Sequence, residues 1–128
     1  VRGICCLIPG RKYSRNIRVT RIVDTFLEHA RVWYFGNGGK PKLFLGSPDW
    51  MRRNLYRRIE AVTPILDPDL KRELSDMLSI QLSDKRKACF VDDHLRNRWK
   101  SARPQKEKVR AQYTFYEYLK SGELRVES

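Results

Sequence analysis

The chain has 128 residues, which is enough for one compact domain and too few for two of ordinary size. Its hydrophobic fraction of 41% allows a packed core and excludes wholesale disorder, and no segment has the run of about 20 apolar residues that spans a bilayer. Lys and Arg number 27 against 15 Asp and Glu, so the net charge of +12 predicts a polyanionic partner: a nucleic acid, an anionic membrane surface or a polyphosphate.

The first half of the chain is predicted to contain a strand, a helix and a hairpin. Arg2 to Ile8 is an almost continuous apolar run closed by Pro9-Gly10, which favours a strand buried on both faces. Apolar residues recur at helical spacing from Ile17 to His29 and indicate an amphipathic helix. Val32 to Phe35 and Lys42 to Leu45 flank a glycine-rich turn, the pattern of a β-hairpin.

The second half begins with a predicted strand from Arg57 to Ile65. A helix is then expected to start at Asp67-Pro68, with Asp67 as the N-cap and Pro68 in the first helical position. This helix would bury one apolar stripe, made of Leu70, Leu74, Met77, Leu78 and Leu82.

The last elements are a short strand and a helix. Lys87 to Val91 is predicted as the strand, and Lys106 to Ser121 as the helix, with Gly122 in its C′ position. The polar, basic stretch from Asn97 to Lys108 is expected to be a loop. Alternating strands and helices favour an α/β domain with a mixed sheet flanked by helices. The three cysteines are interpreted as buried thiols of a protein in a reducing cytoplasm.

Two polar pairs stand out as candidates for chemistry. His29 and Arg31 are two residues apart on an extended stretch and so face the same way, and Arg58 and Glu60 have the same spacing. A histidine at an element boundary is more often structural, and Arg58 with Glu60 can equally be an edge-strand ion pair in solvent. Gly46-Ser47 supplies backbone N–H groups and a hydroxyl at a turn, which suits an anion.

The order of histidine, basic residue and Gly-Ser resembles half of the phospholipase D motif, H-x-K-x4-D-x6-G-S-x-x-N. Arg31 stands in place of the Lys, Gly36 in place of the Asp and Trp50 in place of the Asn, and Gly46-Ser47 comes three residues late. A phosphodiesterase of that superfamily is therefore disfavoured.

A more specific resemblance extends over essentially the whole chain. The sequence contains, in order, V-R-G-I-C-C-L-I-P-G, N-I-R-V, I-V-D-x-F-L-E-H-x-R, F-x-N-G-G, G-S-x-D-W-M-x-R-N-L, R-R-I-E-x-x-x-P-I-L-D-P and K-V-R-A-Q. This series resembles the C-terminal catalytic region of the long, multidomain bacterial polyphosphate kinases. The resemblance implies that residues 1–128 are the C-terminal portion of that catalytic domain and have the fold of a phospholipase-D-like half domain.

The resemblance also implies an activity. The family transfers the terminal phosphate of ATP reversibly to inorganic polyphosphate through a phosphohistidine and with Mg²⁺. The phosphorylated histidine lies on a preceding domain, and His29 matches the second histidine, an acid/base. Arg2 matches a nucleotide-phosphate-binding arginine, and Arg58 and Glu60 match further active-site positions. Further phosphate contacts are expected from Arg31, Ser47 and Asn54, whereas the magnesium ligands are expected outside this chain.

Physical chemistry agrees with these roles, because phosphoryl transfer depends mostly on charge neutralisation and alignment. Arg2 and Arg58 can neutralise phosphate oxygens, Glu60 can orient a histidine by accepting its ring N–H, and His29 can give a proton to the leaving oxygen or take one in reverse. We expect ATP or ADP, polyphosphate and the remaining domains of the enzyme as partners, with homo-oligomerisation of the full-length protein and no nucleic acid. We expect the protein in the cytoplasm or peripherally at the inner membrane. A basic nucleic-acid-binding module remains the alternative that explains the charge equally well.

Overall fold

The computed structural model describes residues 5–101 and 109–121, and the chain divides into two compact units. The first unit combines residues 1–26 with residues 76–128, and the second comprises residues 27–75. Among the described residues, each unit has one three-stranded antiparallel sheet. The α/β class is therefore confirmed, but the single mixed sheet expected from the sequence is wrong. Arg2, a predicted phosphate-binding residue, lies outside the described residues.

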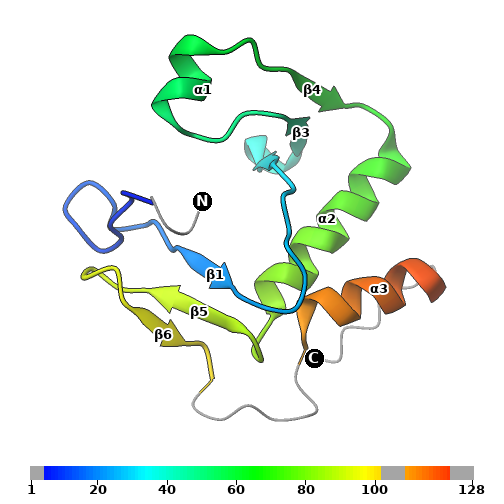
Figure 1. Ribbon diagram of the computed structural model, residues 1–128. Helices are drawn as coiled ribbons and strands as arrows, with labels where there is room; N and C mark the ends of the chain where they lie inside the picture. Colours follow the sequence, from blue (N-terminus) through cyan, green and yellow to red (C-terminus); the bar gives the residue numbers. More distant parts are fainter. Residues whose placement is uncertain (1–4, 102–108, 122–128) are drawn as a thin grey trace. The chain divides into compact units, whose positions relative to one another are not determined.

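The sheet of the first unit has the order β1-β5-β6 (Figure 1). Its strands are β1 (Thr20–Ile22), β5 (Ala88–Val91) and β6 (Asn97–Trp99). The central strand β5 confirms the strand expected at this place, whereas β6 lies in a stretch that was expected to be a loop. Among the described residues of this unit, most buried apolar side chains come from β5 and from two helices: Ala88, Cys89, Val91, Met77, Ile80 and Ala111.

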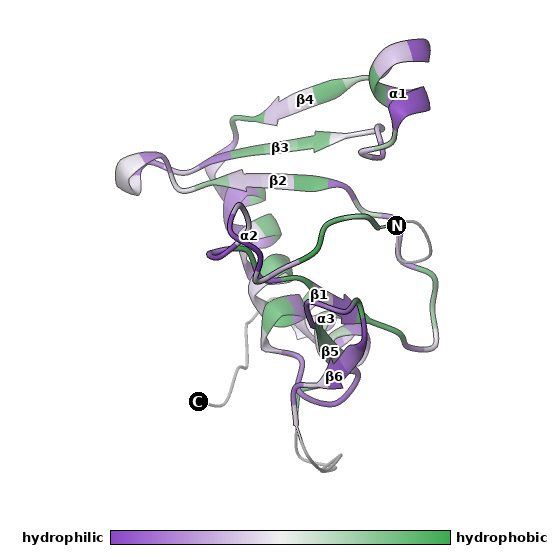
Figure 2. Ribbon diagram, turned by 90° about the vertical axis from the view of Figure 1, so that its left-hand side faces the viewer, coloured by the Kyte–Doolittle hydropathy of each residue, from purple (hydrophilic) through white to green (hydrophobic). Residues whose placement is uncertain are grey.

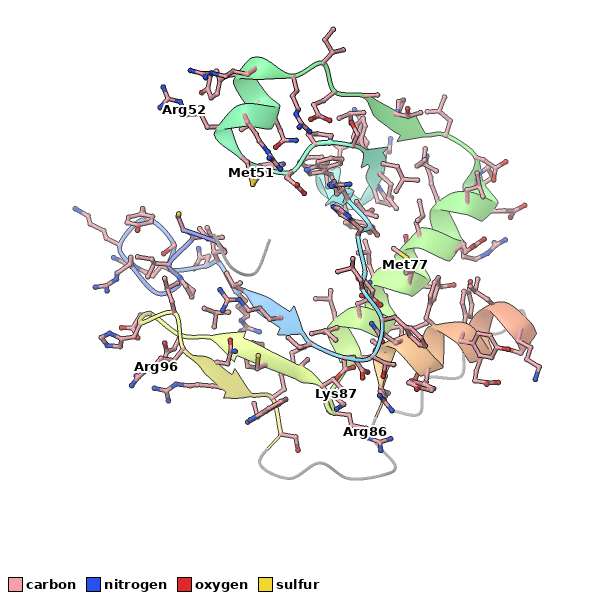
Figure 3. The ribbon with its side chains drawn as sticks, in the orientation of Figure 1. Met51, Arg52, Met77, Arg86, Lys87 and Arg96 are labelled. Atoms are coloured by element: carbon pink, nitrogen blue, oxygen red, sulfur yellow. The ribbon has the colours of Figure 1, made fainter. Side chains whose placement is uncertain are left out.

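Asp84 is fully buried and joins the turn before β5 to the start of helix α3 (Ala111–Ser121). Its Oδ1 accepts hydrogen bonds from the backbone N–H groups of Arg86, Lys87 and Ala88, at 2.9, 2.6 and 2.9 Å. Its Oδ2 accepts one from the N–H of Ala111 at 2.7 Å, a group that the helix itself leaves unpaired. One carboxylate thus shapes the turn before β5, where Figure 3 shows Arg86 and Lys87, and fixes the start of helix α3 (Ala111–Ser121).

Residues 24–26 are bound to the start of α3. Arg110 donates from Nε and Nη2 to the Asp24 carboxylate, at 2.8 and 2.5 Å, and this pairing holds the pKa of Asp24 below its ordinary value. The Gln112 side chain exchanges two hydrogen bonds with the Phe26 backbone, at 2.9 and 2.6 Å. These contacts at residues 24–26, and the pairing of β1 with β5 at residues 20–22, use backbone and polar groups within the segment 17–29. The helix predicted over that segment does not form.

The second unit is built on a sheet of order β2-β3-β4. Its strands are β2 (Val32–Phe35), β3 (Lys42–Gly46) and β4 (Val62–Ile65), and Figure 2 shows the apolar segment within β3. The β2–β3 hairpin is confirmed, with a short 3₁₀ turn η2 (Asn37–Gly39) at its tip. Leu43, at the centre of the sheet, is almost completely buried, and Pro48 in the turn after β3 is buried as well.

The strand expected from Arg57 to Ile65 is wrong over its first half. Arg57 ends helix α1 (Arg52–Arg57), and β4 begins only at Val62. The reason lies in the neighbouring strand, because the β3–β4 register ends at the pair Gly46 with Val62. Residues 58–61 therefore have no ladder partner and form a connecting segment between α1 and β4. Arg58 and Glu60 lie on this segment and not on a strand face.

Helix α2 (Pro68–Ser83) begins as the sequence predicts. The Asp67 carboxylate caps it by accepting hydrogen bonds from the N–H groups of Asp69 and Leu70, at 2.8 and 3.0 Å. The expected apolar stripe is only partly correct. Leu70 and Leu82 are exposed, Leu74 and Leu78 are half-buried, and the most deeply buried side chains are those of Met77 and Ile80.

Three further expectations need correction. The sequence predicted a first strand from Arg2 to Ile8. The structure describes residues 5–8 of this range, and they pair with no described strand. Cys89 is buried, but Cys5 is half-buried and Cys6 is exposed. Helix α3 begins at Ala111 and not at residue 106, and Gly122 lies outside the described residues. Across the described ranges, no helix is long and apolar enough to cross a bilayer.

Candidate active site

The end of β3 is the structural base of the candidate site. The Gly46 N–H donates to the Arg31 carbonyl at 3.2 Å, and the Ser47 N–H donates to the Ala61 carbonyl at 2.9 Å. The Ser47 hydroxyl in turn accepts from the Ala61 N–H at 3.1 Å. A Cβ on Gly46 would lie 2.7 Å from Cζ3 of Trp33 and 2.9 Å from the Ala61 oxygen, so only glycine fits between these two groups. Ser47 is therefore held at one place by its backbone and its hydroxyl.

Glu60 forms a cluster with Ser47 and Asn54. The Ser47 hydroxyl donates to Oε2 of Glu60 at 2.5 Å, and the Asn54 amide donates from Nδ2 to Oε1 at 2.7 Å. These two hydrogen bonds, from Ser47 first and then Asn54, hold the pKa of Glu60 below its ordinary value. The carboxylate is thus charged near neutrality, and each of its oxygens already has a donor.

Asn54 joins helix α1 to this cluster from a buried position, with 5% of its surface exposed. A buried Asn on a short helix is unusual unless its amide is used, because an unpaired amide is costly to desolvate. Its Nδ2 is used by Glu60, but its Oδ1 receives no hydrogen bond from any described residue. The amide therefore keeps one buried acceptor for a further donor.

His29, Arg31 and Asp49 form a second cluster. Arg31 donates from Nε to Oδ1 of Asp49 at 2.9 Å, and its Nη2 contacts Nε2 of His29. Both members of the ion pair are largely covered, with side chains 23% and 18% exposed, and the Arg31 hydrogen bond lowers the pKa of Asp49. A guanidinium can only donate, so Nε2 of His29 is the accepting partner in this contact.

The two clusters lie beside each other in the second unit. The backbone of Arg31 is bonded to Gly46, next to Ser47, and the guanidinium groups of Arg58 and Arg31 contribute to the lowered pKa of Glu60. Arg58 is exposed just beyond the end of α1, and its side chain donates no hydrogen bond to another described residue. Together the clusters place a histidine, two arginines and two carboxylates around one turn.

Sequence reasoning located most of this site but missed one member. Asp49 was not among the predicted site residues, although it is the carboxylate that pairs with Arg31. One signal in the sequence pointed to it: Asp49 lies in the same turn as Gly46-Ser47, two residues after Ser47, where a carboxylate can reach a nearby arginine. The expected pairing of Glu60 with a histidine is not observed among the described residues, because Ser47 and Asn54 occupy both of its oxygens.

The polar surface around the site is basic. Helix α1 is mostly hydrophilic (Figure 2), and the Arg52 side chain extends outward from it (Figure 3). Arg52, Arg53 and Arg57 are all exposed. Over the described ranges, no group of three or more His, Cys, Asp or Glu side chains is arranged to hold a metal ion. The exposed groups of α1 are thus mostly guanidinium donors, which is the chemistry that suits anions such as phosphate.

Comparisons with known proteins agree on one family. Residues 1–112 match the model of the polyphosphate kinase C-terminal domain 2. The polyphosphate kinase of Escherichia coli (strain K12) is 50% identical over 124 residues, 96% of this chain, and that of Synechocystis is 55% identical over 89 residues. The chain belongs to the polyphosphate kinase C-terminal domain 2 family.

A solved structure supports the same relationship. The crystal structure of polyphosphate kinase from Porphyromonas gingivalis aligns with 95% of this chain at a TM-score of 0.88 and 56% sequence identity. This chain spans only a part of these proteins: 18% of the length of the Escherichia coli enzyme and 19% of the crystallised chain.

Proposed function

We propose that residues 1–128 are the C-terminal portion of the catalytic domain of a polyphosphate kinase. The enzyme would transfer the terminal phosphate of ATP reversibly to inorganic polyphosphate, through a phosphohistidine on a preceding domain. The observation that carries the proposal is the pair of adjoining clusters, His29 with Arg31 and Asp49, and Ser47 with Glu60, in a chain of this family. The phospholipase-D-like half-domain fold and the homo-oligomeric full-length enzyme belong to the same proposal.

His29 is assigned the acid/base role. The residue is exposed, so a reacting phosphate oxygen can reach the ring. The contact with Arg31 orients the ring. As an imidazolium, His29 would give a proton to the leaving oxygen and become neutral, and the neutral ring would take a proton back in the reverse direction. Asp49 positions the guanidinium of Arg31 through their ion pair, and Arg31 in turn positions the imidazole of His29.

The arginines are assigned to charge neutralisation. A transferring phosphoryl group carries its charge on the peripheral oxygens, and planar guanidinium groups bind such oxygens through two N–H donors at once. Arg58 is free to turn toward a phosphate because it is exposed, and Arg2 is assigned the nucleotide phosphates on the family resemblance. Ser47 and Asn54 are proposed as further phosphate contacts.

Glu60 is assigned a positioning role in place of orienting a histidine. Its carboxylate fixes the Ser47 hydroxyl and the Asn54 amide, and its negative charge favours keeping Arg58 and Arg31 nearby. Mg²⁺ is proposed to enter with ATP, where it would neutralise charge on the transferring phosphates, and its protein ligands are assigned to other parts of the enzyme. We also propose that the enzyme is cytoplasmic or peripheral at the inner membrane.

Two substitutions at His29, made in the full-length enzyme, test this function. His29→Ala and His29→Gln should both lower turnover by roughly 10²-fold or more, because neither side chain exchanges a proton. The melting temperature should stay near that of the wild type, since an exposed residue contributes little packing. Near-normal turnover of the Gln variant would contradict the acid/base role, and wild-type enzyme without ATP-dependent polyphosphate synthesis would contradict the function itself.

A further inference from the structure

The β5–β6 turn of the first unit is organised around one carboxylate. Oδ1 of Asp92 accepts hydrogen bonds from the backbone N–H groups of His94 and Arg96, both at 2.9 Å. The Asp92 backbone adds two more bonds across the turn, one to Arg96 and one to Leu95, whose φ of 60° is left-handed. The turn is thus specified in detail, although it lies on the surface and contributes nothing to the core.

The other oxygen of the same carboxylate holds two arginines. Oδ2 of Asp92 accepts from Nε of Arg96 and from Nε of Arg98, each at 3.0 Å. Asp92 is 10% exposed, whereas the arginine side chains are 64% and 68% exposed. Desolvation by burial would raise the pKa of Asp92. Its hydrogen bonds lower the pKa below the ordinary value instead, and the largest contributions come from the backbone N–H of Arg96 and the side chain of Arg98.

This arrangement leaves donors directed at solvent. Each guanidinium has five N–H groups, and Asp92 takes only the one on Nε. Within the described ranges, the terminal nitrogens of Arg96 and Arg98 donate to no other residue. The three side chains together carry a net charge of +1. A third arginine joins the hairpin, because Nη2 of Arg11 donates to the Asp93 carbonyl at 3.2 Å. Figure 3 shows the Arg96 side chain at this turn.

We propose that Arg96 and Arg98 are the core of a second anion site, the hairpin fork, which binds a stretch of inorganic polyphosphate. The choice of polyphosphate as the anion rests on the proposed function. Two guanidinium groups fixed on one oxygen present adjacent donor pairs, and a polyphosphate chain offers phosphate oxygens in unbroken succession. The fork belongs to the first unit, whereas every residue of the His29 and Glu60 clusters belongs to the second.

The surroundings of the fork favour polyphosphate over single-stranded nucleic acid. Nucleic-acid surfaces combine positive charge with aromatic rings on which bases stack. Trp99 is adjacent to Arg98 on β6, so its side chain points to the opposite face of the sheet. Phe90 is opposite Arg98 and on the same face, but its ring is already taken by the ammonium group of Lys100, 5.2 Å from the ring centre. A base would have to displace this cation.

Asp92→Asn is the sharpest test, because two explanations predict opposite results. Asparagine keeps Oδ1 for the turn but replaces Oδ2 with an NH₂ group, which cannot accept from either Nε. If the fork binds polyphosphate, the variant should bind it about 3- to 10-fold more weakly. If only diffuse charge matters, the variant should bind as tightly or more tightly, because its net charge is one unit more positive. The latter result would overturn the proposal.

The measurement is the equilibrium binding of end-labelled linear polyphosphate to the full-length enzyme at about 0.3 M salt, where diffuse attraction is screened. The double variant Arg96→Lys with Arg98→Lys keeps the net charge but replaces both planar forks with point charges, and should weaken binding about 10-fold. The matched control, Lys85→Ala with Lys120→Ala, removes two exposed charges from the same unit and should change binding less than about 2-fold. Equal effects of the two double variants would contradict the fork.

Two further readings complete the experiment. Melting temperatures identify any loss of binding that is caused by unfolding. If Asp92→Asn unfolds, the Arg-to-Lys double variant provides the test of the fork.

Single-stranded DNA of equal charge, used as a competitor, should displace labelled polyphosphate only weakly. Displacement as strong as by unlabelled polyphosphate would overturn the assignment. Wild-type turnover is measured separately. Variants that bind normally in an active enzyme contradict the fork alone, whereas fork-dependent binding in an inactive enzyme contradicts the proposed kinase function alone.

Discussion

At the scale of single residues, the candidate site depends on carboxylates that hold other groups. Asp49 pairs with Arg31, Glu60 binds Ser47 and Asn54, and in the first unit Asp92 binds two arginines. The pKa of each of these carboxyls lies below its ordinary value, so all three are charged near neutrality. In a chain with a net charge of +12, the few acidic residues act as organisers of the many basic ones.

Glu60→Gln tests this role through pH. A carboxyl whose pKa is lowered by folding stabilises the folded state above its unfolded pKa, and this contribution is lost as pH falls through the folded pKa. The variant cannot accept from both Ser47 and Asn54, so it should melt below the wild type at pH 7. The difference should shrink below about pH 4. Melting curves of both full-length proteins measure it, and a difference independent of pH would exclude a role for the ionised carboxylate.

At the scale of elements, the site depends on where β3 ends. The strand stops at Gly46, where a side chain would collide with Trp33 and with the Ala61 carbonyl. The same carbonyl accepts from Ser47, so the position of the hydroxyl and the position of the strand end are coupled. The site is thus set by a close approach of two backbone segments, and Gly46 permits that approach.

Gly46→Ala should therefore displace Ser47 from Glu60. The added methyl must move either the Trp33 ring or the chain at Ala61, which weakens the cluster and lowers turnover by about 10-fold or more. Gly36→Ala is the matched control: its φ of −63° suits alanine, and a Cβ there meets nothing within 4 Å. Turnover and melting temperature of both variants of the full-length enzyme give the comparison. Equal, small effects would show that the packing at Gly46 does not control the site.

A second prediction at this scale concerns Asp84. Asp84→Asn keeps an oxygen for the turn before β5 but faces Ala111 with an NH₂ group, and Asp84→Ala loses all four hydrogen bonds. Hydrogen exchange of the intact enzyme should show about 10-fold less protection for the first turn of α3 in the Asn variant, and less protection for both α3 and β5 in the Ala variant. Loss confined to β5 in either variant would contradict the capping role.

At the scale of the whole molecule, this chain corresponds to about a fifth of its relatives. It spans 18% of the Escherichia coli polyphosphate kinase and 19% of the crystallised Porphyromonas gingivalis enzyme. The proposed reaction needs two histidines, and this chain supplies one of them. The remaining parts of the proposed site, including the phosphorylated histidine and the magnesium ligands, are therefore assigned to other domains.

The isolated chain should accordingly have no polyphosphate kinase activity. Incubation of the purified 128-residue chain with ATP, Mg²⁺ and polyphosphate should give no phosphate transfer, because the nucleophile of the proposed mechanism is absent. The full-length enzyme under the same conditions is the positive control. ATP-dependent phosphorylation of the isolated chain would show that a residue within it acts as the nucleophile, and would contradict the composite site.

Local signals in the sequence determined several parts of this protein correctly. The β2–β3 hairpin, the strand β5 and the start of α2 at Asp67 were all predicted, because a glycine turn, an apolar run and an N-cap act within a few residues. The family resemblance was confirmed as well, since ordered motifs are a property of the sequence itself. The spacing of His29 and Arg31 predicted that they face the same way, and the two side chains are in contact.

Only the tertiary structure decided the remaining features, because they depend on partners far apart in the chain. Residues 17–29 have a helical pattern, yet β5 pairs with β1, and Arg110 and Gln112 bind Asp24 and Phe26 from 86 residues away. The strand predicted over Arg58 and Glu60 ends where β3 ceases to offer a partner. The roles of Asp49 and Asp92 likewise depend on which arginines folding brings to them, which no local pattern specifies.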